Sequence, residues 1–322
     1  MNILVTGGAG YIGSSLAPLL LAEGHRVRVL DALLHGGEPL LGIWAHPCFE
    51  FVRGDICDRA SVKAAVAGIE GVVHLAAVVG DPACARQPER ARAVNLQASL
   101  ALIEESQRAG VSRFLFASTC SNYGKMKDAD NYVDEETELR PVSLYAETKV
   151  AVEKALLQSA CAGKWCPTPM RFATIFGVSP RMRFDLTVNE FTMEMLTKKR
   201  LKVFGEQFWR PYVHVRDAAR AIQLVLSSPP AKVDAAVFNV GATDQNFQKR
   251  QLVEMIRPYA PEAVVEFVHK EEDPRDYRVS FTRITERLGF KITRTVADGI
   301  EEVAHLVRNN VIGNYDDWRY RN

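Results

Sequence analysis

The sequence predicts an α/β fold in which a doubly wound parallel sheet carries a smaller α/β lobe. Three observations support this fold class. Short β-rich runs alternate with helical stretches over the first two-thirds of the chain, a glycine-rich turn follows the first run, and the pattern changes near residue 180. Apolar strands separated by helices indicate a parallel sheet that helices cover on both faces.

The individual elements follow from this alternation. In the first part we expect, in order, strand Met1–Thr6, helix Ile12–Glu23, strands Arg26–Asp31 and Phe49–Arg53, helix Ser61–Val66, strand Gly71–Leu75, helix Ala91–Ala109 and strand Arg113–Ser118. Beyond about Arg181 we expect helix Leu186–Lys199, strand Leu201–Val203, loop Gly205–Arg210, helix Asp217–Leu226, strand Phe238–Val240, helix Lys249–Tyr259 and strand Ala263–Val268.

Two domains are expected from the change of pattern. Residues 1–180 form the main domain, and residues 181–322 mainly form the smaller lobe, although some segments return to the main domain. In open parallel sheets, ligands bind beyond the carboxyl ends of the strands, near the point where the strand order reverses. The turns after the strands are therefore the place to look for a site.

Composition excludes several classes of protein. The chain has 322 residues, of which 47% are hydrophobic and 25% charged, as in ordinary globular proteins. A net charge of +1 gives no reason to expect nucleic acid or an anionic membrane as partner. The amino terminus shows no secretory signal, and no apolar window is long enough for a membrane span. Six cysteines without metal-ligand spacing favour a reducing, cytoplasmic setting and no bound metal.

A glycine loop follows the first expected strand and opens the first expected helix. Gly7, Gly10 and Gly13 form a GxxGxxG pattern around Tyr11 and Ile12. Glycine permits the tight turn and lets backbone amides approach a pyrophosphate at the helix amino terminus, where the helix dipole favours negative charge. By itself such a loop also fits a purely structural turn.

The turns after the next strands favour a dinucleotide. Asp31 ends the second strand, where a carboxylate accepts hydrogen bonds from the adenosine ribose and repels a 2′-phosphate, so that NAD is favoured over NADP. A solvated turn aspartate is the alternative. Asp55 and Ile56 are placed to bracket the adenine, and Leu75, Ala76 and Ala77 to line the cofactor with small side chains. The main domain is therefore expected to be a Rossmann-type, NAD-binding domain.

A second group of residues is placed to react. Thr119 follows the strand that ends at Ser118, and Tyr145 and Lys149 lie one helical turn apart in a YxxxK pattern. A nearby ammonium, together with the positive nicotinamide, favours tyrosinate and lowers the phenol pKa. Tyr145 would then take a proton from a sugar hydroxyl while hydride leaves the same carbon.

In this order, the glycine loop, Asp31, the HLAA segment at 74–77, STCSNYG at 118–124 and YAETK at 145–149 resemble the extended short-chain dehydrogenase/reductases. Within them the chain looks like the NAD-dependent epimerase/dehydratase family, from residue 2 to roughly 290. The resemblance implies NAD as cofactor and a nucleotide-diphosphate sugar as substrate. It also implies a homodimer through the segments Ala91–Ala109 and Tyr145–Ser159.

The resemblance also assigns roles to single residues. Thr119, Tyr145 and Lys149 match the catalytic residues of the family, Lys149 also holding the nicotinamide ribose, and Asn95 matches an asparagine that supports the site on the cofactor side. On the substrate side the matching residues are Ser121, Thr174, Asn189, Arg210, and Arg275 or Arg278. Thr174 stands where asparagine is common in the family. The arginines would grip the diphosphate, because a guanidinium binds phosphate in a bidentate way. Surface ion pairs are the alternative.

The two residues after Thr119 discriminate between reactions. Sugar 4,6-dehydratases of the family carry an Asp-Glu pair there, whereas this chain has Cys120 and Ser121. This favours an isomerase that epimerises at C4 by transient oxidation to a keto-sugar. The alternatives are a non-standard dehydratase that uses Cys120 in catalysis, a decarboxylase or a keto-sugar reductase. Cys120 also fits a small apolar wall residue. A non-enzymatic cofactor-binding scaffold is disfavoured because Tyr145 and Lys149 are both kept.

Overall fold

A seven-stranded parallel sheet forms the centre of the computed structural model, which describes residues 1–126, 131–160, 165–273 and 276–322. The order is β10-β6-β5-β4-β1-β2-β3, so the direction of winding reverses between β1 and β4. The bounds are β1 Asn2–Thr6, β2 Arg26–Asp31, β3 Phe49–Arg53, β4 Gly71–His74, β5 Arg113–Thr119, β6 Cys166–Phe172 and β10 Phe238–Val240. The predicted Rossmann-type fold class is confirmed.

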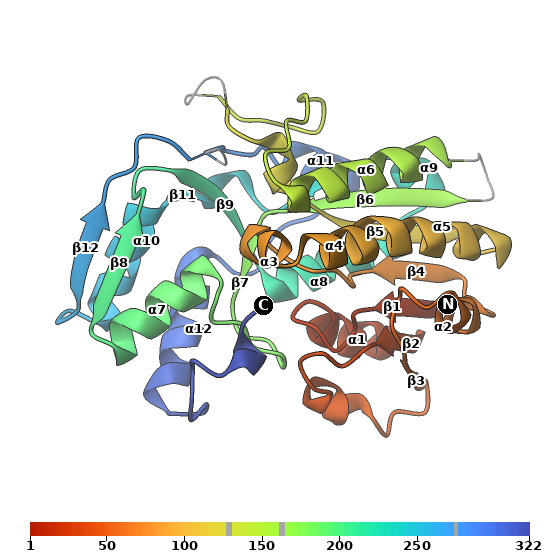
Figure 1. Ribbon diagram of the computed structural model, residues 1–322, viewed down its shortest axis with the longest axis horizontal. Coiled ribbons are helices and arrows are strands. Elements are labelled where there is room, and N and C mark those ends of the chain that lie inside the picture. The colour runs from red at the N-terminus through yellow and green to blue at the C-terminus, as the bar shows by residue number, and fades with distance from the viewer. Residues whose placement is uncertain (127–130, 161–164, 274–275) are drawn as a thin grey trace.

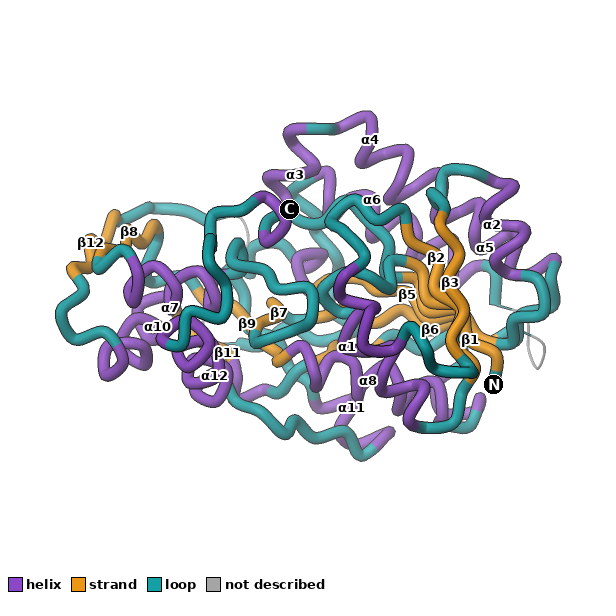
Figure 2. The backbone as a smooth tube through the Cα atoms, turned by 90° about the horizontal axis from the view of Figure 1, so that it is seen from below, coloured by secondary structure: helices purple, strands orange, loops and turns teal. Residues whose placement is uncertain are grey.

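Alternate residues of each central strand enter two separate cores, as a doubly wound sheet requires. In β1, Ile3 and Val5 pack with α1 (Gly13–Ala22) and α8 (Val215–Ser227), whereas Leu4 packs on the other face. That face is covered by α2 (Arg59–Val66), α5 (Ser99–Arg108) and α6 (Leu144–Gln158). Figure 2 shows α1 and α8 on one side of the strands and α2 and α5 on the other.

Strand β6 is absent from the sequence prediction because its residues, Cys166 to Phe172, include Pro167 and Pro169. Proline lacks the N–H that a sheet ladder needs, so it normally argues against a central strand. Here β6 still pairs with β5 on one side and β10 on the other. The two prolines are thus the reason that the sequence pattern did not predict β6.

The single helix expected at Ala91–Ala109 is divided in the structure. It consists of α4 (Pro88–Arg92), a π-helical turn at Ala93–Ala98 and α5, and a short α3 (Asp81–Arg86) precedes it. Asn95 lies in the π-helical turn, and its main-chain oxygen accepts a hydrogen bond from the Ser99 hydroxyl at 2.9 Å. Such turns often occur at functional sites.

The smaller lobe lies beyond β6 and contains two further sheets (Figure 1). Its strands are β7 (Thr174–Phe176), β8 (Arg200–Phe204), β9 (Trp209–His214), β11 (Asn246–Gln248) and β12 (Val264–Val268), and its main helices are α7 (Thr187–Thr197), α10 (Lys249–Ile256) and α12 (Val296–Arg308). The loop expected at Gly205–Arg210 is shorter, because β9 already begins at Trp209. Two further helices, α9 (Pro230–Val233) and α11 (Thr282–Leu288), lie beside β6 and β10.

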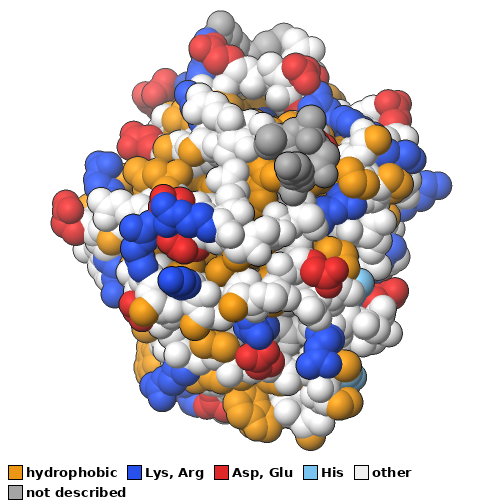
Figure 3. Space-filling view, turned by 90° about the vertical axis from the view of Figure 1, so that its right-hand side faces the viewer, with side chains coloured by type: hydrophobic (Ala, Val, Ile, Leu, Met, Phe, Trp, Pro, Cys, Tyr) orange, Lys and Arg blue, Asp and Glu red, His pale blue; other side chains and the backbone are white. Residues whose placement is uncertain are grey.

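Surface properties agree with the composition. No helix in the described part of the chain is long and apolar enough to cross a membrane. Figure 3 shows acidic and basic side chains interspersed on the face that it displays, without a broad field of one sign. An anion therefore has to be bound by local groups.

Candidate active site

The glycine loop leaves no room for side chains at two of its positions. Gly7 has a φ of +72°, and a Cβ on it would lie 2.8 Å from the Ala76 nitrogen. A Cβ on Gly13 would lie 2.5 Å from both the Gly7 oxygen and the Gly8 Cα. The loop is thus packed against the turn after β4 and against its own helix. This close packing gives a cradle in which backbone amides, rather than side chains, face a ligand.

Asp31 stands beside this loop at the end of β2. Its carboxylate accepts hydrogen bonds from the Ala9 nitrogen at 2.9 Å and the Leu33 nitrogen at 2.8 Å. Burial raises the pKa of this carboxyl, and the two amides and Arg181 oppose that effect. A carboxylate has about four acceptor sites, so it can still accept from ribose hydroxyls.

The turn after β4 is organised by buried polar side chains. His74 is bonded to the Thr6 hydroxyl at 2.7 Å and to the Ser99 hydroxyl at 2.9 Å. Asn95 is 1% exposed, accepts from the Val78 nitrogen at 2.8 Å and donates to the Val78 oxygen at 2.9 Å. Its amide is therefore bonded to the protein main chain, as expected for a side chain that supports the site. It fixes the chain just after Leu75–Ala77.

The turn after β3 carries the residues expected near adenine. Asp55 accepts from the Cys57 nitrogen at 2.9 Å and lies 3.7 Å from Arg90 in an ion pair. Ile56 is 5% exposed and belongs to the core under α2 and α5. Of Asp55 and Ile56, Asp55 is thus the one whose side chain is open to solvent.

Tyr145 and Lys149 lie on one face of α6, as the YxxxK spacing predicts. The Lys149 ammonium is buried, donates to the Ala117 oxygen at 2.7 Å and lies 5.9 Å from the centre of the Tyr145 ring. Burial lowers the pKa of Lys149 to about 8. Burial also raises the pKa of the Tyr145 phenol, and Cys84 adds to this while Arg183 opposes it. The expected lowering of the phenol pKa thus needs further positive charge.

The start of α6 is fixed to α3 by one polar contact. Ser143 caps the helix by accepting from the Ala146 nitrogen at 3.3 Å, and its hydroxyl donates to the Asp81 carboxylate at 2.6 Å. Neither residue belongs to the predicted site. Because Tyr145 is two residues after Ser143, this contact sets where the phenol lies.

Thr119 lies at the end of β5, beside α6. Its hydroxyl oxygen accepts from the Ser121 nitrogen at 3.1 Å, and 9% of the residue is exposed. Ser121 in turn lies 3.3 Å from the hydroxyl of Tyr277, a residue that sequence reasoning did not select. The Thr119 turn therefore connects the YxxxK helix to the smaller lobe.

Cys120 points away from this site. It is 1% exposed, and its thiol donates to the Arg171 oxygen at 3.3 Å. Burial raises the pKa of the thiol well above its ordinary value. This environment is that of a small core residue rather than of an acid/base group.

Comparison with known proteins identifies the family to which this site belongs. The model of the NAD-dependent epimerase/dehydratase family matches residues 3–241. The chain belongs to this family. It is 29% identical over 272 residues to UDP-glucose 4-epimerase of Corynebacterium glutamicum, covering 80% of each chain. It is 30% identical over 309 residues to dTDP-glucose 4,6-dehydratase of Streptomyces griseus, covering 93% of this chain and 92% of the relative.

The family membership agrees with the fold of a solved structure. UDP-glucose 4-epimerase of Thermus thermophilus, in complex with NAD, superposes with a TM-score of 0.83 at 26% identity, covering 96% of this chain and 99% of that one. NAD is the cofactor of the family. The close-packed glycines and the Asp31 carboxylate of the present chain fit it, because they supply amides and an acceptor where a dinucleotide needs them.

Two of the residues expected near the cofactor and substrate are instead used to join the lobes. Asn189 is fully buried, accepts from the Gly177 nitrogen at 2.9 Å and donates to the Arg183 oxygen at 2.8 Å. The Tyr11 hydroxyl donates to the Gly177 oxygen at 2.5 Å. Both side chains are bonded to protein groups here, and the diphosphate contact expected of Asn189 stays a prediction. Only the main chain of Tyr11 belongs to the loop surface.

Of the predicted arginines, Arg210 and Arg278 lie on the smaller lobe, where protein groups already engage them. Arg210 is ion-paired with Asp273 at 2.6 Å and lies 5.6 Å from the centre of the Tyr277 ring. Arg278 stacks on Trp209, with 5.0 Å between its guanidinium carbon and the ring centre. Thr174 begins β7 and is partly exposed, and Arg275 lies outside the described residues.

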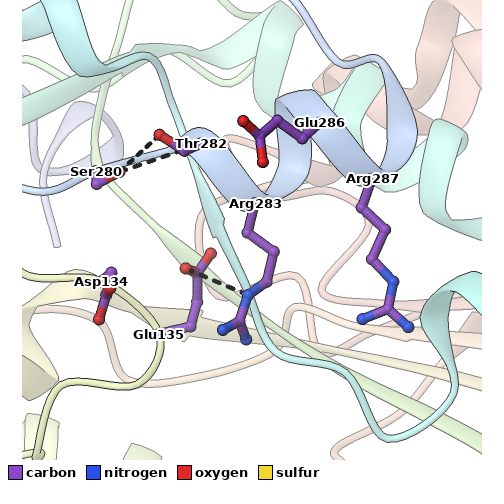
Figure 4. A pocket seen from close by; sticks show the side chains of 7 residues that line it. All are labelled: Asp134, Glu135, Ser280, Thr282, Arg283, Glu286 and Arg287. Carbon is purple, nitrogen blue, oxygen red and sulfur yellow. Dashed lines mark hydrogen bonds and ion pairs between the residues drawn. The ribbon is translucent and has the colours of Figure 1, made fainter.

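One surface pocket lies apart from these residues. Figure 4 shows Arg283 of α11 pointing toward Glu135, whose oxygen lies 3.6 Å from the Arg283 Nε. The other lining residues are Asp134, Ser280, Thr282, Glu286 and Arg287, and none of the seven belongs to the predicted site. Its charges are therefore partly neutralised by one another, and the predicted site residues lie elsewhere.

Proposed function

We propose that this protein is a nucleotide-sugar 4-epimerase that uses Tyr145 as acid/base. The supporting observation is the arrangement of Tyr145 and Lys149 on α6 beside Thr119 at the end of β5. These three side chains supply a proton acceptor, a positive charge that favours its ionised form, and a hydroxyl to orient the sugar oxygen. No further acid or base is required to invert one carbinol.

In the proposed reaction, the Tyr145 phenolate takes the proton of the C4 hydroxyl and later returns it. NAD, when bound, accepts the hydride from C4 and gives it back, and its oxidised nicotinamide adds positive charge beside Tyr145. Lys149 holds the nicotinamide ribose, and its positive charge opposes the effect of burial on the phenol. Rotation of the keto-sugar between the two transfers inverts C4, so the reaction consumes no outside oxidant or reductant.

On the substrate side, Arg210, Arg278 and Thr174 are proposed to face the nucleotide diphosphate. Arg210 would exchange part of its contact with Asp273 for phosphate oxygens. The Ser121 hydroxyl lies beside the Tyr277 hydroxyl, and the Tyr277 ring in turn lies beside the Arg210 guanidinium. Ser121 and Tyr277 would therefore lie between the reacting sugar and the diphosphate.

A 4,6-dehydratase is the second candidate, since relatives of that name match over most of the chain. Elimination of water needs an acid and a base besides the tyrosine. The residues next to Thr119 are a buried thiol and Ser121, which supply neither. This difference favours epimerisation.

The decisive experiment is incubation of the purified protein with UDP-, dTDP-, GDP- and CDP-sugars, followed by mass spectrometry and NMR. We expect a product of unchanged mass with inverted C4. Loss of water or of carbon dioxide, or net consumption of reduced cofactor, would contradict the proposal.

Replacing Tyr145 by Phe tests the catalytic assignment. We expect turnover to fall about 10²- to 10⁴-fold while NAD stays bound, because only the proton-transfer group is removed. As a matched comparison, Cys120→Ser keeps a donor for the Arg171 oxygen and should change turnover by less than about threefold. A collapse in Cys120→Ser, with Tyr145→Phe still active, would move the acid/base role to the thiol.

A further inference from the structure

A buried arginine lies between the two lobes without a carboxylate partner. Arg181 is 4% exposed and follows β7. Its Nη2 donates to the main-chain oxygen of Arg321 at 3.1 Å and to the Asn322 side-chain oxygen at 2.8 Å. Among the described residues its Nε has no hydrogen-bond partner and its guanidinium has no ion pair. A buried cation in this state needs an anion to offset its lost hydration.

The charges around the Arg181 guanidinium also indicate that it needs an anion. The pKa of Arg181 is lowered to about 10, mainly by burial and also by the neighbouring Arg183, whereas Asp185, Tyr11 and Asp31 oppose this shift. Arg183 is different, because it forms a two-pronged ion pair with Asp185 at 2.9 and 2.7 Å. Of these two arginines, Arg183 has a carboxylate as ion-pair partner, whereas Arg181 has none among the described residues.

The segment that carries Arg181 is bonded to the first turn of α1. The Arg181 nitrogen donates to the Ser14 hydroxyl at 3.3 Å, and the Ser179 hydroxyl donates to the Tyr11 oxygen at 2.7 Å. Ser15 lies 3.1 Å from the same Ser179 hydroxyl. The guanidinium charge also acts on Asp31, at the far side of the glycine loop. Arg181 thus lies between the helix end expected to bind pyrophosphate and the carboxylate expected to bind ribose.

The carboxyl-terminal residues hold this guanidinium in place. We define the strap as Trp318–Asn322. Its Asn322 nitrogen donates to Asp185 at 3.1 Å, and its main-chain oxygen accepts from Arg86 of α3 at 3.0 Å. At its other end the Trp318 ring lies 6.1 Å from that of His35, which follows β2. Figures 1 and 2 both place the carboxyl end of the chain between the lobes.

We propose that Arg181 binds the pyrophosphate of NAD and that the strap holds it against the cofactor. The proposal rests on the dinucleotide lying along Gly7–Gly13, as in the proposed function. The unused Nε gives a phosphate oxygen a charged donor in a buried setting, where such bonds are strong. Retention of NAD through repeated reaction cycles then depends on two residues outside the glycine loop, Arg181 and Asn322.

The test uses wild type, Arg181→Gln and Arg181→Lys, with Arg59→Gln as control. Arg59 is an exposed arginine of α2 that pairs with Glu104. NAD per chain is measured after denaturation of the purified proteins, and affinities of stripped protein for NAD, ADP and adenosine by calorimetry. We expect Arg181→Gln to bind NAD and ADP at least about tenfold more weakly and adenosine within about twofold of wild type. Arg181→Lys should recover part of the loss, and Arg59→Gln should match wild type.

Shortening the chain to end at Asp317 gives a second variant should Arg181→Gln fold poorly. It leaves Arg181 in place and should release NAD at least about tenfold faster during dialysis. Equal NAD and ADP affinity in wild type and Arg181→Gln would overturn the inference, and so would NAD release at the wild-type rate from the shortened chain. If Arg181→Gln binds NAD normally but dTDP or UDP more weakly, the diphosphate belongs to the sugar nucleotide and the NAD assignment is wrong. A wild-type protein that binds no NAD would instead defeat the proposed function itself.

Discussion

His74 shows how strongly single residues depend on burial at this site. It lies at the carboxyl end of β4 with both ring nitrogens bonded to hydroxyls, and only 1% of it is exposed. Burial, together with a smaller effect of the Lys149 charge, lowers its pKa from 6.5 to about 3. The imidazole is therefore neutral in the folded protein throughout the physiological range. Its function is to hold Thr6 and Ser99 beside the turn that carries Leu75–Ala77.

This burial predicts acid sensitivity. Between about pH 6.5 and 3 the unfolded chain binds a proton on His74 that the folded chain does not, so the free energy of unfolding falls as pH falls. The contribution is about 1.4 kcal/mol per pH unit. Urea unfolding of wild type and His74→Asn at pH 7.5 and pH 5 measures it. The stability gap between the two should narrow by about 2 kcal/mol at pH 5; a gap that stays constant would show that His74 titrates normally.

Residue-level prediction from the sequence succeeded where a motif fixes both spacing and secondary structure. Tyr145 and Lys149 share a helix face because four residues make one turn, and Gly7 and Gly13 occupy positions that a Cβ would overfill. The roles of Asn95 and Asn189 stay predictions, since their amides bond to the main chain of Val78 and of Gly177 and Arg183. An amide looks the same in the sequence whether it binds a ligand or a loop. Only the fold decides between the two.

At the scale of elements, a buried polar network joins the strands and helix that carry the residues proposed to be catalytic. Glu153 of α6 and Arg171 of β6 form an ion pair at 2.8 Å, with side chains 2% and 5% exposed. Glu153 also bonds to Ser118 and to Asn122, which flank Thr119. The network therefore sets the separation between the Thr119 turn and the helix of Tyr145.

Breaking this pair should be costly. Glu153→Gln leaves a buried guanidinium without its carboxylate, and we expect a loss of about 3–5 kcal/mol in the free energy of unfolding. Glu104→Gln is the matched control, since Glu104 is a 46% exposed carboxylate paired with Arg59 and Arg108. It should cost about 1 kcal/mol or less. Denaturant unfolding of both variants measures the two losses in the free energy of unfolding. A similarly small loss in both would mean that the network does not fix the position of the Thr119 turn.

The elements themselves were predicted well where short β-rich runs stand between turns or helices. The expected bounds of β2, β3 and β10 match those of the structure. They were predicted poorly where local chemistry and tertiary packing disagree. The prolines of β6 hide a central strand, and the helix expected at Ala91–Ala109 is interrupted because Asn95 turns inward to bond Val78. In both places packing outweighs local preference.

At the scale of the whole molecule, the site lies where the lobes meet, so no single segment of the chain contains it. The glycine loop and the YxxxK helix belong to the main sheet, whereas Tyr277, Arg210 and Arg181 come from the chain beyond β6. The segment Arg181–Asp185 departs from the usual pattern of the family, and from the sequence we expect it to face the sugar or the diphosphate without a definite role for Arg181. Nothing in the sequence shows that the Asn322 end of the chain lies against it.

One surface of the main domain carries partly exposed apolar side chains on neighbouring helices. Helices α5 and α6 lie side by side on the outer face of the sheet, with Leu100 of α5 38% exposed. Leu96 in the π-helical turn before α5 is partly exposed, and so are Ala151 and Ala155 of α6. Leu96 and Leu100 are four residues apart, as are Ala151 and Ala155. We propose that two chains pair through these helices, because an apolar stripe on adjacent helices is best covered by another such pair.

Light scattering after gel filtration tests the pairing. Wild type should have twice the mass of one chain at micromolar concentration, and Leu100→Arg should shift toward the mass of one chain, because an arginine at the centre of the contact buries an unpaired charge. Leu41→Arg is the control, since Leu41 is 67% exposed on the 3-10 turn Glu38–Ile43, away from α5 and α6. A wild type with the mass of one chain, or a Leu100→Arg variant that keeps the wild-type mass, would contradict the pairing. Since α6 also carries Tyr145 and Lys149, loss of pairing should lower turnover in proportion to the fraction of single chains, while Leu41→Arg leaves turnover unchanged.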